Sequence, residues 1–61
     1  MKSTLLIKPV GSLKLGTKVL FEGVTGYIVY QNTLYSVIEN DDNDLSSVRN
    51  DIEVRIWRYN K

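Results

Sequence analysis

The stretch Gly26-Tyr-Ile-Val-Tyr-Gln-Asn-Thr-Leu-Tyr-Ser-Val-Ile-Glu39 decides the fold class of this chain. Two runs rich in β-branched and aromatic residues flank the polar segment Gln31-Asn32-Thr33, which is the composition of two strands joined by a hairpin turn. We therefore predict one strand over Gly26–Gln31 and a second over Leu34–Glu39. Both strands carry apolar side chains on both faces, which is typical of a tightly curled sheet or of an outer surface that a partner covers.

Short apolar runs continue on either side of this hairpin. They predict strands over Thr4–Lys8, Lys18–Glu22 and Val54–Tyr59, and an additional pairing segment near Leu45–Val48. Alanine is absent, and no window shows the apolar period of an amphipathic helix. Strands at such regular spacing indicate a sandwich or a barrel, and 61 residues are too few to fill a sandwich. We expect one all-β domain spanning residues 1–61.

The chain contains no cysteine and no histidine. Disulfide frameworks, zinc ribbons, zinc fingers and iron–sulfur sites are therefore excluded. The usual general bases and thiol nucleophiles are also missing, and no serine has a visible partner that could activate it. A barrel of this size has no room for a deep pocket. We expect a protein that is not an enzyme and that binds no cofactor.

The acidic loop Glu39–Asp44 places oxygen-bearing side chains at the spacing of the first half of an EF-hand calcium loop. The pattern fails further on, because Leu45 stands where the calcium loop needs glycine and Asp51 is shorter than the usual bidentate glutamate. We expect a polar turn whose charges deter edge aggregation. Weak binding of a cation by this loop stays open.

The formal net charge is +1, but the charges are unevenly distributed along the chain. Residues 1–21 hold four lysines and no acid, residues 22–53 hold seven acids and one arginine, and residues 54–61 hold only basic charges. The two basic ends would form one patch if the first and last strands were neighbours.

The apolar runs, such as Tyr27–Tyr30, are far shorter than the roughly 20 residues of a membrane-spanning helix. Residues 1–10 do not resemble a signal peptide, because Lys8 and Pro9 interrupt the apolar stretch. We therefore expect a cytoplasmic protein.

Residues 16–54 resemble the small SH3-like barrels of the KOW and Tudor type, and the order of elements is similar to that of small SH3-like proteins of bacteriophages and prophages. The resemblance rests on a glycine before a strand, a glycine pair around a bent strand, an acidic turn and a Val-x-x-x-Ile stretch. These features are Gly16-Thr-Lys-Val19, Gly23-Val-Thr-Gly26-Tyr-Ile28, Tyr35-Ser-Val37 with the acidic turn after it, and Val48-Arg-Asn-Asp51-Ile52.

The resemblance implies a five-stranded SH3-like barrel. In such barrels the second glycine, here Gly26, opens a strongly bent strand, and Ile28 enters the core. The stretch near 48–52 would be a short 3-10 turn before the last strand. Residues 1–15 fit no standard element of the family, and we expect them to add an N-terminal edge strand.

The last strand carries the composition of a binding hot spot. Alternation places Arg55, Trp57 and Tyr59 on one face, and Val54, Ile56 and Arg58 on the other. Trp57 can fill the core or face a partner, and the sequence leaves both open. Tyr30 shares a face with Ile28, so we predict Tyr30 in the core and Tyr27 on the surface. The expected partner contacts are Tyr27, Val29, Arg55, Trp57 and Tyr59.

The sequence therefore predicts a non-enzymatic protein-binding module. The resemblance implies a phage or prophage accessory protein that acts on a host or phage protein, in the host cytoplasm if the chain is phage-encoded. The partner can also be a second copy of the chain in a homodimer. Nucleic-acid binding is the first alternative, since KOW and Tudor-like barrels resemble known nucleic-acid readers and both ends are basic, although the acidic middle section would repel phosphates. A structural subunit of a larger assembly is the second.

Overall fold

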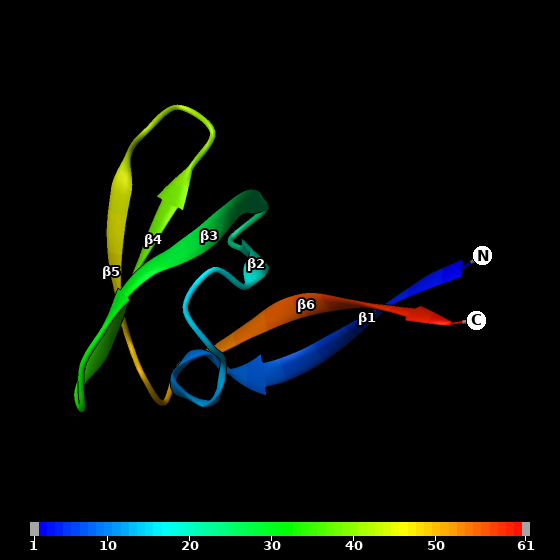
Figure 1. Ribbon diagram of the computed structural model, residues 1–61, viewed down its shortest axis with the longest axis horizontal. Helices are drawn as coiled ribbons and strands as arrows, with labels where there is room; N and C mark the ends of the chain where they lie inside the picture. Colours follow the sequence, from blue (N-terminus) through cyan, green and yellow to red (C-terminus); the bar gives the residue numbers. More distant parts are fainter. Residues whose placement is uncertain (1, 61) are drawn as a thin grey trace.

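The computed structural model of the protein describes residues 2–60, with the side chains of residues 5–57. Its strands are β1 (Lys2–Pro9), β2 (Lys18–Phe21), β3 (Val24–Gln31), β4 (Tyr35–Asn40), β5 (Leu45–Arg49) and β6 (Glu53–Asn60). They form one antiparallel sheet in the order β1-β6-β2-β3-β4-β5 (Figure 1). The predicted all-β class is confirmed, and so are the six strands, whose ends lie within two residues of the predicted ends. The N-terminal strand β1 is an edge strand, as predicted.

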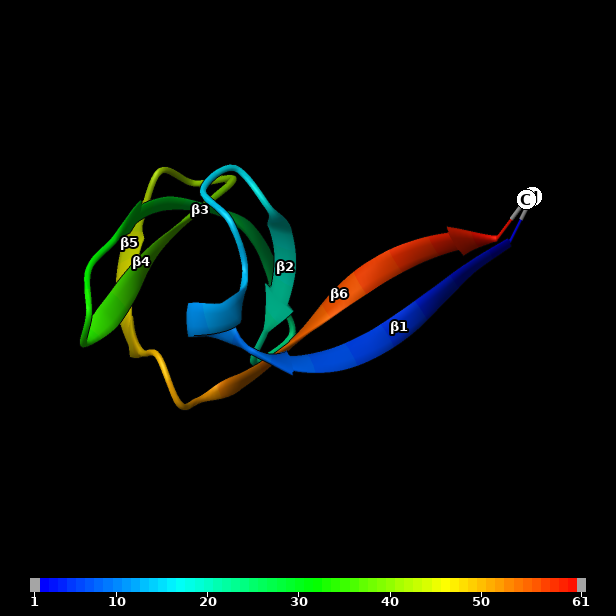
Figure 2. The same ribbon diagram turned by 60° about the horizontal axis from the view of Figure 1, so that its bottom comes forward.

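The sheet curls so that β2, β3, β4 and β5 surround a common interior, while β1 and β6 extend away from it as a ribbon (Figure 2). The short segment η1 (Val10–Ser12) follows β1 and meets the turn before β6, where Val10 N–H donates to the Ile52 carbonyl (2.9 Å) and Gly11 N–H to the Asn50 carbonyl (3.1 Å). The core takes one buried side chain from each of η1, β2, β3, β4, β5 and β6. These are Val10, Val19, Ile28, Ile38, Val48 and Val54.

The segment η1 is a 3-10 helix that the sequence did not predict. The 3-10 turn predicted near 48–52 is present as a single hydrogen-bonded turn, in which Ile52 N–H donates to the Arg49 carbonyl at 3.0 Å. Val48 and Arg49 themselves belong to β5. None of the described residues forms a helix that is long and apolar enough to span a membrane.

Strands β2 and β3 are joined by a two-residue turn. Both turn residues have positive φ, at 52° for Glu22 and 78° for Gly23, which is the conformation of a type I′ hairpin. This turn ends β2 at Phe21, one residue before the predicted end of the strand. The right-handed twist of such a turn matches the twist of the strands that it joins, so it supports the curl of the sheet.

A β-bulge in β3 overturns the prediction for Tyr30. Ile28 pairs with Ile38 and Tyr30 with Val37, so Val29 is an extra residue in the β3–β4 ladder. The extra residue reverses the alternation after Ile28. Tyr30 is therefore 49% exposed and lies outside the core. Gln31 then points inward in its place.

A buried polar network closes one end of the interior. Gln31 Nε2 donates to the Leu13 carbonyl (2.7 Å) and to Ser36 Oγ (3.2 Å). The fully buried hydroxyl of Ser36 donates to Asn50 Oδ1 (2.8 Å), and Asn50 Nδ2 donates to the Asn32 carbonyl (2.8 Å). Because each buried polar group has a partner, the network fixes the loop after η1, the β3–β4 hairpin and the β5–β6 turn without leaving an unpaired group.

Candidate functional site

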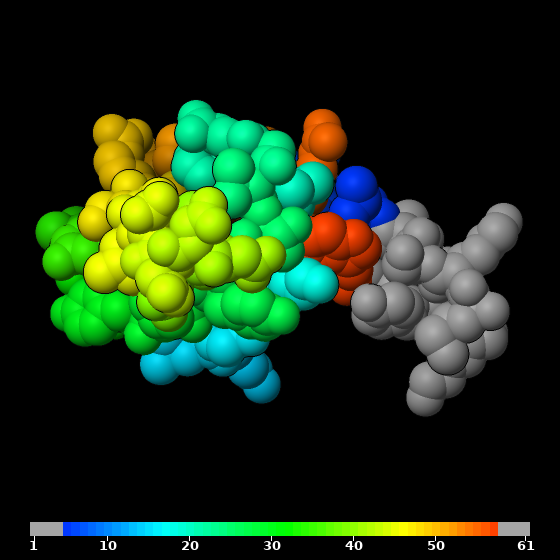
Figure 3. Space-filling view, turned by 90° about the horizontal axis from the view of Figure 1, so that it is seen from above, coloured from blue at the N-terminus to red at the C-terminus, as the bar shows by residue number. Residues whose placement is uncertain are grey.

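Four side chains form a continuous row on the outer face of the sheet. Trp57 of β6 pairs with Leu5 of β1, and Lys18 of β2 pairs with Tyr27 of β3. The two pairs meet because Lys18 Nζ lies 5.3 Å from the centroid of the Trp57 ring. We call Leu5, Trp57, Lys18 and Tyr27 the outer row. Figure 3 shows atoms of β1 (blue), β6 (orange-red), β2 (cyan) and β3 (green) next to one another on one face of the molecule.

The outer row places partly exposed apolar side chains next to one another. Leu5 is 44% exposed and Tyr27 is 45% exposed. Trp57 is half-buried and lies on the opposite face of β6 from the core residue Val54. The question that the sequence left open for Trp57 is thereby answered: the indole belongs to the outer face and not to the core.

The structure brings some of the predicted contact residues together and separates others. Tyr27 and Trp57 are joined through Lys18. Arg55 is exposed on the same face, two residues from Trp57. Val29 is also exposed, but it lies at the bulge, beyond the part of β3 that pairs with β2. The side chain of Tyr59 lies outside the described residues.

Two members of the outer row, Leu5 and Lys18, were missed by sequence reasoning. Both stand on strands that the sequence predicted, and each alternates with residues that face inward. Their place beside Trp57 depends on β6 lying between β1 and β2, which brings residues 5, 18 and 57 side by side. A correct assumption about strand order, combined with alternation, would have found them.

The basic ends of the chain are neighbours, because β1 pairs with β6 over their whole length. Their charges do not form a single patch among the described side chains. Lys18 and Arg55 lie on the outer face, whereas Lys8 pairs with Val54 and so lies on the other face of the ribbon. The outer face therefore combines apolar side chains with a few cations.

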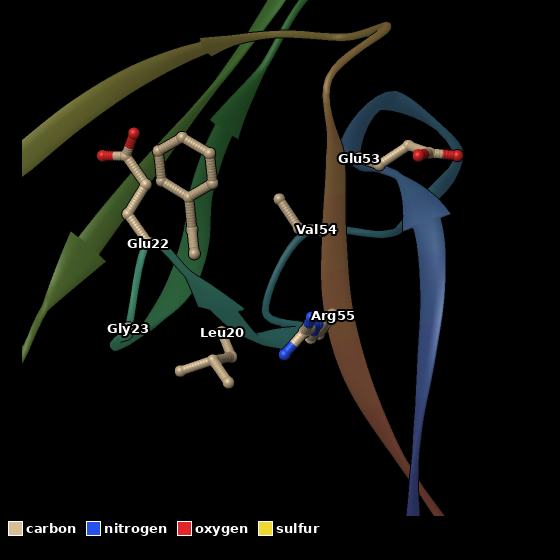
Figure 4. A pocket seen from close by; sticks show the side chains of 7 residues that line it. Leu20, Glu22, Gly23, Glu53, Val54 and Arg55 are labelled. Carbon is tan, nitrogen blue, oxygen red and sulfur yellow. The ribbon is translucent and has the colours of Figure 1, made fainter.

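A groove of about 390 Å³ opens where β2 and β6 separate (Figure 4). The two strands pair only at Val19–Ile56 and Leu20–Arg55, so the backbone beyond these pairs diverges. The carboxylates of Glu22 and Glu53 line the groove but point in different directions.

The acidic loop uses its own side chains to satisfy its backbone. Asn40 Oδ1 accepts hydrogen bonds from the amides of Asp42 (2.9 Å) and Asp44 (3.0 Å), and Asn43 adopts a positive φ of 65°. The oxygen that would begin a calcium loop is therefore engaged. Within the described part of the chain, no three histidine, cysteine, aspartate or glutamate side chains are grouped so that they could hold a metal ion.

No known protein family, curated protein sequence or solved structure matches this chain. The outer row and its neighbours are therefore interpreted from their own chemistry.

Proposed function

We propose that this protein is a non-enzymatic protein-binding module that docks through the outer row. The observation that supports the proposal is the continuity of Leu5, Trp57, Lys18 and Tyr27 across four strands on a face that the chain leaves in solvent. Tryptophan, tyrosine and arginine are enriched in binding hot spots, and the two aromatic side chains bury a large area at a small cost in conformational entropy.

A chain of this size needs few side chains to fill its core, so apolar side chains on the outer face call for another explanation. Six side chains, one from each surrounding element, form the buried apolar core. Tyr27, Leu5 and Trp57 are not needed to fill it, yet they line up instead of being scattered. Scattered apolar residues on a surface are ordinary, whereas a row of them with polar residues around it is typical of an interface.

The chemistry of the row favours a protein over a nucleic acid. Bases stack on open aromatic faces, and the ammonium group of Lys18 already lies over the Trp57 ring. A protein partner could instead pack on Tyr27 and Leu5 and place a carboxylate beside Lys18 or Arg55. In line with the resemblance to small phage and prophage proteins, we propose that the partner is a bacterial host protein or another phage protein.

The experiment that tests the proposal is affinity capture from a bacterial lysate with tagged wild-type protein and with two tyrosine variants. Tyr27→Ala removes a member of the row. Tyr30→Ala is the matched control, because Tyr30 lies on the same strand with a similar exposure of 49% but beyond the bulge. We expect a protein that wild type and Tyr30→Ala capture equally and that Tyr27→Ala loses.

The captured protein is then purified and titrated against all three forms. A hot-spot tyrosine should weaken binding by about 10-fold or more when it is truncated to alanine. Nuclease treatment and raised salt should leave capture intact, since phosphate-driven binding would weaken steeply as the salt concentration rises. Equal loss in both tyrosine variants, or capture that nuclease abolishes, would contradict the proposal.

A further inference from the structure

Strand β1 has a second edge that pairs with no other strand among the described residues. Val10 directly follows the last residue of β1, and its N–H donates to the Ile52 carbonyl just before β6. The backbone groups of Val10 therefore face β6. Because backbone groups alternate sides along an antiparallel strand, the even-numbered residues of β1 face β6. Leu5 and Ile7 therefore direct their N–H and C=O groups to the open edge. Pro9 also falls on that side, which is where a strand tolerates proline.

The middle of this edge lacks the features that normally protect an edge strand. Proteins protect such edges with charged residues, proline or bulges. Here Lys8 and Pro9 stand at one end, whereas Leu5 and Ile7 are apolar and are 44% and 59% exposed. An edge of this kind is a template for one more antiparallel strand.

The ribbon formed by β1 and β6 also needs further support. Strand β2 pairs with β6 only at Ile56 and Arg55, so from Trp57 onward the ribbon has two strands. A two-stranded ribbon is marginally stable in water, and three or more strands with an apolar face are needed for independent stability. Figure 2 shows that the ribbon extends away from the curled sheet, which leaves its edge accessible.

We propose that the occupant of this edge is β1 of a second copy of the chain, paired antiparallel with Leu6 on the twofold axis. In this register Leu5 lies opposite Ile7 of the second copy, and Ile7 lies opposite Leu5. All four of these residues direct backbone groups toward the new interface, so each pair exchanges two hydrogen bonds. The two exposed apolar side chains of each copy become cross-strand neighbours, which is the unit of sheet stabilisation.

Charge and proline select this register over its neighbours. With Leu5 on the axis, Lys2 would stand opposite Lys8, and like charges directly opposite are destabilising. With Ile7 on the axis, Leu5 would stand opposite Pro9, which has no N–H to donate. With Leu6 on the axis, Pro9 instead stands opposite Ser3 at the end of the ladder, where the missing bond does not involve the apolar residues. Only the Leu6 register pairs the apolar residues and keeps the lysines apart. The result is a central four-stranded sheet in the order β6-β1-β1-β6.

This inference goes beyond the proposed function, because it concerns the backbone edge of β1, although Leu5 of the outer row lies beside that edge. The two can fail separately. Dimerisation is tested on the purified protein alone, whereas the binding experiment requires a captured partner.

The absence of cysteine from the chain makes a crosslinking test simple. Two Leu6 residues on the axis form a non-hydrogen-bonded pair with Cα atoms about 4.5 Å apart, within the range of a disulfide. Leu6→Cys should therefore oxidise to a covalent dimer on a non-reducing gel. Leu5→Cys, whose own counterpart is a diagonal neighbour, should crosslink far less. Ser47→Cys places an exposed thiol on β5, at the opposite edge of the sheet, and controls for random oxidation.

A second measurement keeps the test decisive if Leu6→Cys disturbs packing. Sedimentation equilibrium of the wild type should give twice the chain mass of 7.0 kDa. Ile7→Lys, which adds a charge to the open edge and leaves the β1–β6 bonds in place, should give the mass of one chain. A wild type that remains at 7.0 kDa up to its solubility limit, or Ser47→Cys crosslinking as well as Leu6→Cys, would overturn the proposal.

Discussion

The ammonium nitrogen of Lys18 lies 5.3 Å from the centroid of the Trp57 ring. This cation–π contact links the first residue of β2 to the middle of β6. These two strands share only two paired positions, Val19–Ile56 and Leu20–Arg55. The cation–π contact therefore extends the junction between β2 and β6 by one further residue pair. It also determines which face of the indole a partner can reach.

Replacing Lys18 tests this contact. We expect Lys18→Gln to lower the free energy of unfolding by about 0.5 kcal/mol, the lower end of the range for exposed cation–π pairs. Because Trp57 is the only tryptophan, its emission reports the change directly, and urea unfolding followed by fluorescence gives the stability. Lys14→Gln, at an exposed lysine in the loop before β2, is the control and should change neither quantity. Equal effects of the two variants would show that the contact contributes nothing.

Removal of the Ser36 hydroxyl tests the buried polar network. Ser36→Ala takes away the donor to Asn50 Oδ1 and leaves that amide oxygen short of a partner. Gln31 Nε2 loses one acceptor but keeps the carbonyls of Leu13 and Val10. A buried polar group without its partner costs about 1–3 kcal/mol, so we expect a loss of that size in chemical denaturation. Ser47→Ala, on the exposed strand β5, should change stability by no more than about 0.5 kcal/mol. A Ser36→Ala variant as stable as Ser47→Ala would disprove the role assigned to the network.

The β2–β3 turn offers a stabilising substitution. Glu22 holds a φ of 52°, a region that asparagine occupies more readily than glutamate, and Asn-Gly is a preferred pair for this turn type. We expect Glu22→Asn to raise the free energy of unfolding by about 0.5 kcal/mol. Glu22→Ala removes the same carboxylate without the preference for positive φ. If it stabilised the protein equally, loss of charge and not turn geometry would be the cause.

The exposed pair Arg49–Asp51 predicts a pH-dependent effect whose sign follows from the geometry. Hydrogen bonds from the Arg49 guanidinium, with the closest N···O distance 2.9 Å, lower the pKa of the Asp51 carboxyl below its usual value. The contribution of Asp51 to stability is therefore present above its unfolded-state pKa and is lost as the pH falls through the lowered value. Arg49→Gln should raise the pKa of Asp51 in a carboxyl-detected NMR titration, whereas Arg55→Gln should leave it unchanged. Because both partners are fully exposed, the effect on stability should be small.

The strands were predictable because the information for them is local. Alternation in Val54–Tyr59 placed Arg55 and Trp57 on the face opposite Val54, as the structure has them. Turn residues gave the ends of the strands to within two positions. These signals depend on neighbours in the chain and do not require knowledge of the partner strand.

The features that escaped prediction depend on contacts between distant segments. The bulge at Val29 is defined by the register of β3 with β4, so no pattern within β3 alone predicts it. The prediction for Tyr30 was wrong for this reason. Gln31 and Asn50 likewise look like ordinary loop-flanking residues until β5 and η1 enclose them. For the candidate site, alternation identified Tyr27 and Trp57, but strand order was needed to join them.

The register of β1 with β6 places Lys2 opposite Asn60, so both described ends of the chain leave the fold side by side. Tension applied between these two residues would separate β1 from β6 starting at this end, breaking the hydrogen bonds of the ribbon one pair at a time. The curled part of the sheet would carry load only once the pairs as far as Leu5–Trp57 had separated, because the next residue of β6, Ile56, also pairs with β2. Joined to other chains at both ends, the domain would thus yield at low force and lengthen before its core was disturbed.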